Sequence, residues 1–156
     1  MAIFTATIMS KLSYGLASAC LSTAEQRRLD GFQSRCLRKI WGIKPAFVSR
    51  VSNKAVLEAT GTTPLSRTLM RQKLLIFGKV VRAPASSVLR DSAFCPGQLR
   101  PATDRYVRKV GRPRREWVTE VSKVAEQVAG AHGRLADVVC CRVTWERLVD
   151  SFMARG

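Results

Sequence analysis

The chain has 156 residues, of which 46% are apolar. This share excludes a wholly disordered protein and allows one domain or two small helical units. The formal net charge is +16, from 27 lysine and arginine residues against 11 acidic residues and one histidine. Such an excess predicts an anionic partner, with the RNA or DNA backbone as first candidate. No apolar run approaches the length of a membrane span, so we expect no membrane association.

Helical periodicity begins at the N-terminus. Residues 2–20 predict a buried helix that is broken near Gly15. A capping box at 22–25 then begins a helix over 23–41, which stops at Gly42. This second helix is predicted to have a basic face and an apolar stripe that packs on the first and fourth helices. The stripe consists of Leu29, Phe32, Cys36, Leu37 and Ile40.

The next segment alternates between breakers and helix starts. A loop over 43–51 contains Pro45, and Ser52 with Asn53 can cap a short helix over 54–59. A Thr-Pro pair opens the next helix, which runs over 64–82 and has a wide apolar face.

Periodicity is lost after residue 82. Prolines, glycines and serines over 83–110 indicate a linker, with one helical turn around 87–91. A helix beginning near Trp117 is broken by Gly130 and Gly133. A final helix is expected over 135–153, and its apolar face stacks Val138, Cys141, Trp145, Leu148 and Phe152.

The sequence therefore predicts an all-α fold, an irregular bundle of about five to six helices in two helical units. We expect a basic helical core over 1–82, a flexible, basic, Pro-containing linker over 83–110, and a C-terminal helical pair over 111–156 that starts with the basic string GRPRR.

The positive charge is unevenly placed, because residues 117–156 hold five basic and five acidic residues. The excess of positive charge therefore lies in the residues before Trp117. Ordinary solvent-exposed helices carry basic and acidic residues together, so this excess is not explained by solvation alone. We expect the basic side chains of helices 23–41 and 64–82, with a second cluster in GRPRR, to contact nucleic-acid phosphates. These residues are Arg28, Arg35, Arg38, Lys39, Arg67, Arg71, Lys79, Arg82, Arg112, Arg114 and Arg115.

Two features have a plainer alternative. The Gly-Arg-Pro-Arg string at 111–114 is similar to an AT-hook, in which arginines enter the minor groove, but a basic linker is the favoured interpretation. Trp41, Trp117 and Trp145 occupy apolar-face positions, so we expect core packing and not base stacking.

No catalytic motif accompanies these helices. The acidic residues are scattered, no glycine loop could cradle phosphate, and His132 fits an exposed loop. We therefore expect no enzymatic activity, no cofactor and no metal. The five cysteines form no CxxC pair and no signal peptide is evident, which predicts free, mostly buried thiols in a reducing compartment, nuclear or cytoplasmic and not secreted.

Five strings occur in order along the chain. They are YG at 14–15, LDGFQSRCLRKIWGI at 29–43, the pairs SN, VL, TG and PL within 52–65, FGKVVR at 77–82, and GRPRREW at 111–117. Together they resemble the region downstream of the polymerase domain in non-LTR (LINE-type) retrotransposon reverse transcriptases. The family's usual Gly-His is Gly78-Lys79 in this chain.

The resemblance implies a C-terminal remnant, or truncated piece, of a retroelement protein. RNA-directed DNA polymerase activity would belong to a longer parent, whose polymerase domain is a further expected partner. This chain would then hold template or primer through phosphate contacts, largely independent of sequence. Two alternatives stay open: a helical protein–protein interaction module that docks through residues 117–156, and a decayed retroelement remnant without selected function.

Overall fold

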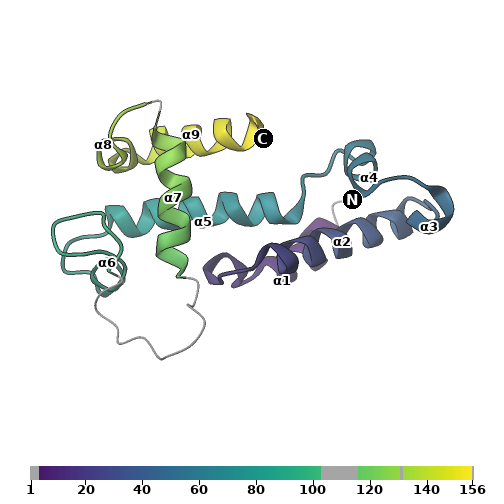
Figure 1. Cartoon of the computed structure of the whole chain (residues 1–156), viewed down its shortest axis with the longest axis horizontal. Helices are drawn as coiled ribbons and strands as arrows, with labels where there is room; N and C mark the ends of the chain where they lie inside the picture. Colours follow the sequence, from purple (N-terminus) through teal and green to yellow (C-terminus); the bar gives the residue numbers. More distant parts are fainter. Residues whose placement is uncertain (1–3, 103–115, 131, 156) are drawn as a thin grey trace. The chain divides into compact units, whose positions relative to one another are not determined.

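The computed structural model describes residues 4–102, 116–130 and 132–155. Over these residues the fold is all-α, as predicted, and the only extended pairing is one antiparallel bridge between Phe94 and Pro101 (Figure 1). The described residues form nine α-helices, more than the expected five to six. The difference arises because several helices have only four to seven residues.

The chain divides into two compact units. One, called the 21–70 unit, comprises Leu21–Met70; the other, called the larger unit, comprises residues 1–20 and 71–156. Helix α5 (Leu65–Arg82) contributes residues to both. This division differs from the boundaries expected after residues 82 and 110, which stay a prediction.

The N-terminal segment is helical but discontinuous. A π-helical turn, Phe4–Met9, leads into α1 (Ser10–Ser13), and a 3₁₀ turn follows over Leu16–Ser18. Gly15 separates them with a φ of 75°, a conformation that glycine adopts without steric cost. The predicted break near this residue is confirmed.

In the 21–70 unit, local caps set the helix bounds. Helix α2 (Thr23–Ile40) begins at the predicted capping box: the Ser22 hydroxyl accepts from the Glu25 N–H at 3.3 Å, and Glu25 Oε2 accepts from the Ser22 N–H at 2.6 Å. The Ser52 hydroxyl caps α4 (Asn53–Ala59) at 3.1 Å. Both starts confirm the sequence analysis.

The segment expected to be a loop over 43–51 contains a short helix, α3 (Ala46–Ser49). Pro45 precedes its first residue, a position where the missing proline N–H costs no helical hydrogen bond. Pro45 therefore starts a helix where the sequence analysis expected it only to break one.

The buried face of α2 is polar, which corrects the predicted apolar stripe. Leu37 is buried, but Phe32 and Ile40 are exposed, and the positions that face inward with Leu37 are Gln33, Ser34 and Arg38. Helix α2 packs against α4, which is the third helix of the sequence prediction. Packing of its apolar stripe on the first predicted helix stays a prediction, and the hydrogen bonds that it forms with the predicted fourth helix, α5, are made by polar side chains. The remaining core of the 21–70 unit consists of Val56, Leu65 and Leu69.

Two polar side chains of α2, the buried Gln33 and the half-buried Asp30, cap α5 from outside. Gln33 Oε1 accepts from the Leu65 N–H at 2.7 Å and its amide donates to the Thr63 carbonyl at 2.9 Å. Asp30 accepts from the Ser66 N–H at 2.8 Å and from the Ser66 hydroxyl at 2.7 Å. The first amides of α5, which have no partner inside the helix, are thus satisfied by α2.

The larger unit contains α6 (Val88–Ala93), α7 (Trp117–Ala129), α8 (Leu135–Cys140) and α9 (Arg142–Arg155) around the C-terminal part of α5. The single helix predicted over 135–153 is wrong. The chain leaves helical geometry at Cys141, whose φ of −89° and ψ of 113° are extended, and α9 begins at the next residue. Cys141 is therefore exposed and not part of the predicted stack.

The core of the larger unit is centred on Trp145 of α9, which lies beside α5 (Figure 1). The indole N–H donates to the Leu74 carbonyl at 2.9 Å. Phe77 lies 6.3 Å from the Trp145 ring and 5.7 Å from Phe94, edge to face with the latter. Gly78 provides the space for the indole, because a Cβ built there would lie 2.5 Å from it.

Candidate nucleic-acid interface

Three of the four basic residues predicted on α2 lie on one exposed stripe. Arg28, Arg35 and Lys39 are all exposed, and their spacing of seven and four residues brings them to the same side of the helix. From Arg28 to Lys39 the stripe covers about 16 Å along the axis. We call these three residues the α2 stripe. None of them takes part in an ion pair with the residues that the structure describes.

Arg38 has a different role from the one predicted. Its side chain is only 4% exposed, because it is rotated about 100° around α2 from Lys39. One guanidinium nitrogen donates to the Lys44 carbonyl at 3.2 Å and the Ser49 hydroxyl at 3.3 Å. The other donates to the Val51 carbonyl and to Asn53 Oδ1. Arg38 holds the 44–53 segment and is not available to phosphate.

The predicted residues of α5 fall into both units. Arg67 is half-buried, and its Nη2 is buried without a hydrogen-bond partner. Arg71 donates to Asp150 at 2.7 Å, and this hydrogen bond raises the pKa of the Arg71 guanidinium. We therefore expect both residues to contribute less to a phosphate site than predicted. Arg67 is partly buried, and the charge of Arg71 is already paired with Asp150.

Lys79 and Arg82 lie together in the larger unit. They line a groove of about 620 Å³ with Arg142, which the sequence analysis did not select because it lies in the electrically balanced C-terminal part. Arg82 also donates to the Val139 carbonyl at 2.9 Å, and Arg142 pairs with Glu146 at 2.7 Å. Of these three cations, Lys79 and Arg82 have no ion pair with a described residue, and Lys79 is the more exposed of the two. The second predicted cluster lies outside the described residues; it consists of Arg112, Arg114 and Arg115.

The sequence analysis missed a group of exposed residues around α3. Lys44 and Arg50 are exposed cations that flank the helix, and Phe47 is exposed within it. Trp41 is also exposed, so the expectation that it packs in the core is wrong, whereas Trp145 is buried as expected. Trp41 follows the last residue of α2, where helical periodicity no longer predicts which way a side chain faces.

The cysteines are more accessible than predicted. All five are free thiols; three are half-buried, and Cys140 and Cys141 are exposed at the junction of α8 and α9. This corrects the expectation of mostly buried thiols. The two neighbours differ in their contacts: Cys140 donates to the Asp137 carbonyl at 2.8 Å, whereas hydrogen bonds from Thr144 lower the pKa of Cys141.

We therefore expect Cys141 to be the first cysteine alkylated by iodoacetamide near neutral pH, because its lowered pKa increases the thiolate fraction and its sulfur is exposed. Peptide mapping by mass spectrometry after short exposures measures the rate at each position. Replacing Thr144 with valine removes the hydroxyl donor and is expected to slow alkylation of Cys141. Faster modification of Cys140 would contradict this assignment.

Comparisons with protein-family models, with curated proteins and with solved structures found no match for this chain. Within residues 4–102, 116–130 and 132–155, no helix is both long and apolar enough to cross a bilayer. The same residues contain no group of three histidine, cysteine, aspartate or glutamate side chains that could hold a metal ion.

Proposed function

We propose that this chain is a non-catalytic, largely sequence-independent nucleic-acid-binding protein, and that it derives from the post-polymerase region of a retrotransposon reverse transcriptase. The observation that supports binding most strongly is the α2 stripe. Arg28, Arg35 and Lys39 form a continuous line of exposed cations on one face of a long helix. The family assignment is supported by the five ordered sequence strings.

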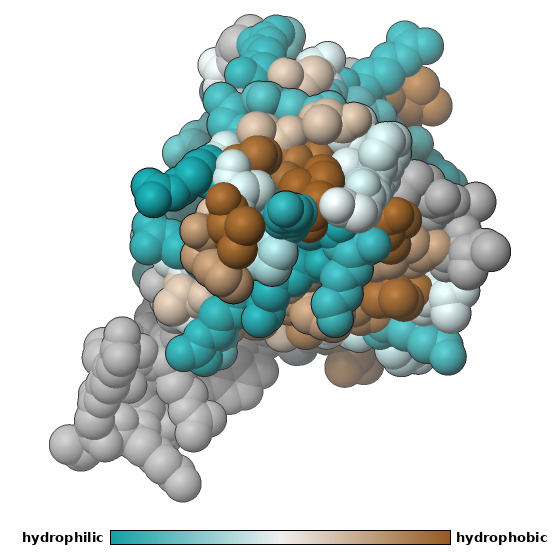
Figure 2. Space-filling view, turned by 90° about the vertical axis from the view of Figure 1, so that its right-hand side faces the viewer, coloured by the Kyte–Doolittle hydropathy of each residue, from teal (hydrophilic) through white to brown (hydrophobic). Residues whose placement is uncertain are grey.

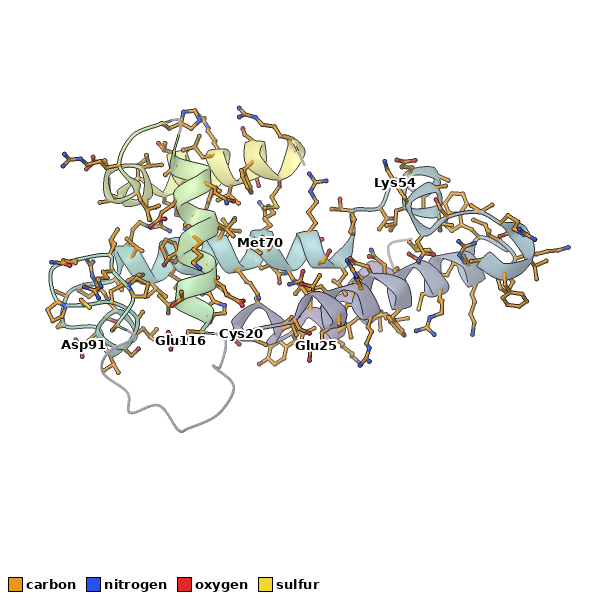
Figure 3. The ribbon with its side chains drawn as sticks, in the orientation of Figure 1. Cys20, Glu25, Lys54, Met70, Asp91 and Glu116 are labelled. Carbon is orange, nitrogen blue, oxygen red and sulfur yellow. The ribbon has the colours of Figure 1, made fainter. Side chains whose placement is uncertain are left out.

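The acidic residues of the 21–70 unit do not neutralise this stripe. There are three of them against nine basic residues. Glu25 belongs to the capping box at the start of α2 (Figure 3). Asp30 caps α5, and Glu58 lies 3.8 Å from Lys54 on α4. An uncompensated cationic face attracts polyanions, and its strength is expected to fall steeply with salt.

Contacts from lysine and arginine to phosphate carry no base information, so binding through this stripe is expected to tolerate any sequence. RNA and DNA both present the required backbone. The parent polymerase domain is a further proposed partner, and a reducing compartment, nuclear or cytoplasmic, is the proposed location.

The test compares two triple variants that lose the same net charge. One is Arg28→Ala/Arg35→Ala/Lys39→Ala, which removes the α2 stripe; the other is Lys54→Ala/Arg71→Ala/Arg155→Ala, which removes three cations elsewhere. Fluorescence anisotropy with a labelled oligonucleotide measures affinity at several salt concentrations. The stripe variant is expected to bind at least about tenfold more weakly, and its salt slope is expected to be shallower by about 2–3, because three phosphate contacts are lost.

The control variant is expected to keep an affinity within about threefold of the wild type, since none of its cations belongs to the stripe and two of them, Lys54 and Arg71, are already ion-paired. Equal weakening of both triple variants would mean that net charge alone governs binding, and the α2 stripe would then not be the site. Circular dichroism melts of both variants confirm that the fold is kept.

The alternative of a protein-docking module at residues 117–156 stays a prediction, and so does a decayed remnant without selected function. Trp145 and Val149 of α9 are buried within their own unit and are not free to dock a partner. Deleting residues 117–156 would remove the indole that contacts Leu74 and Phe77. The charge variants therefore separate the hypotheses more cleanly than a deletion does.

A further inference from the structure

Two aromatic rings are exposed at the end of α2 and in the short helix that follows. Phe47 is 83% exposed and Trp41 is 52% exposed. Their neighbours Ile40 and Val48 are each more than half exposed as well. Large apolar side chains gathered on one surface normally mark a binding site. We call residues 40–51 the α3 tip.

The α3 tip is held in place by partly buried hydrogen bonds, and its helix α3 has no buried residue of its own. Arg38 donates to the Lys44 carbonyl, to the Ser49 hydroxyl and to the Val51 carbonyl. The Ile43 N–H donates to the Arg38 carbonyl at 2.9 Å, which closes the end of α2. These contacts fix the backbone that carries both rings, so a ligand would meet rings on an ordered backbone, which lowers the entropic cost of binding.

The surroundings of the rings are cationic. Lys39, Lys44 and Arg50 are exposed, and no aspartate or glutamate occurs between Asp30 and Glu58. Figure 2 looks onto the side of the molecule where α3 lies and shows hydrophobic surface interspersed with hydrophilic surface. Lys39 also belongs to the α2 stripe and directly precedes the α3 tip in the chain.

The combination of exposed aromatic rings and exposed cations indicates which kind of ligand the α3 tip would bind. An apolar protein partner would not need the surrounding cations, and duplex nucleic acid keeps its bases stacked inside, away from the rings. A single strand offers both phosphates for the cations and free base faces for the rings. Every base has such a face, so this recognition would also be independent of sequence.

We propose that the α3 tip stacks unpaired bases on Trp41 and Phe47, while the α2 stripe holds the adjoining phosphates. This inference rests on the proposed function and narrows its ligand to single-stranded nucleic acid. The chain would accordingly prefer a single strand to a duplex of the same length.

The test uses the full chain and two labelled probes of equal length, an oligo(dT) of about 20 nucleotides and a duplex of about 20 base pairs. Anisotropy titrations at one salt concentration compare the wild type with Trp41→Ala and Phe47→Ala. The matched control is Tyr14→Ala, because Tyr14 is an exposed aromatic residue in the larger unit. Each α3-tip variant is expected to lose at least about fivefold in single-strand affinity, the effect of one lost base stack.

Duplex affinity is expected to change less than about twofold, and the salt slope for both probes is expected to stay unchanged, because no charge is removed. Trp41→Phe keeps an aromatic face and is expected to restore most of the single-strand affinity. Wild-type protein that binds neither probe would overturn the proposed function together with this inference. Wild-type binding with α3-tip variants that match Tyr14→Ala, or that lose both probes equally, would overturn this inference alone.

Discussion

Replacing Trp145 with alanine is expected to lower the free energy of unfolding by about 3–5 kcal/mol, the usual cost of removing a buried large aromatic side chain. Trp145 is fully buried and contacts the Phe77 ring, and its indole N–H donates a hydrogen bond to the Leu74 carbonyl. Its removal would leave a cavity between α9 and α5. Urea denaturation followed by circular dichroism measures the loss.

Gly78 tests the same contact from the opposite side. A methyl group there would lie 2.5 Å from the indole, so Gly78→Ala is expected to cost about 1–3 kcal/mol through overpacking. Gly31 is the matched control, since it also lies inside a helix but has no neighbouring atom within 4 Å of a built Cβ. Gly31→Ala is expected to stabilise α2 by about 0.5–1 kcal/mol. Equal effects of the two substitutions would contradict the packing described for Trp145.

Arg38→Ala is the second substitution expected to have a large effect, with a loss of about 3 kcal/mol in the free energy of unfolding, because two backbone carbonyls lose the charged donor that a buried side chain supplies. The carbonyls of Lys44 and Val51 both accept from this guanidinium. Lysine cannot replace the planar fork that reaches several acceptors, so Arg38→Lys is expected to rescue little. Denaturant unfolding measures each variant.

Arg35→Ala is the matched control for Arg38→Ala. Arg35 lies three residues earlier on the same helix but is exposed, so its removal is expected to change stability by less than about 0.5 kcal/mol. Its effect should be on nucleic-acid affinity instead. If the two variants had the same stability, Arg38 would not be the structural residue that its hydrogen bonds indicate.

Helix bounds could be predicted from the sequence where a cap or a glycine sets them. Ser22 with Glu25, Ser52 and Gly42 mark the ends of α2 and α4 within one or two residues, because these signals are local. The split at Cys141 could not be predicted, since the residues on either side continue the apolar periodicity and no glycine or proline marks the break.

The buried face of α2 was missed for a different reason. Periodicity analysis counts apolar residues, whereas this face buries Gln33 and Arg38. These two side chains are buried because they form hydrogen bonds with residues more than five positions away in the sequence. The same two residues belong to the string that resembles retrotransposon proteins. In this chain, therefore, part of that string maintains the fold, and Arg35 and Lys39 are among its exposed positions.

The candidate site was predicted in part. Arg28, Arg35 and Lys39 were predicted on the basic face of α2 and are exposed, but Arg38 was predicted there as well and is buried. The α3 tip could not be identified in advance, because Trp41 and Phe47 lie outside regular helical periodicity and their exposure depends on how Arg38 holds the segment.

The most direct test of electrostatic nucleic-acid binding is a filter-binding titration of the wild-type chain with a single strand between about 50 and 200 mM salt. About five phosphate contacts, from the α2 stripe with Lys44 and Arg50, predict that affinity falls about a hundredfold over this range. An affinity that changes less than about threefold would contradict the account, because a binding surface made of these cations must release counterions from the nucleic acid.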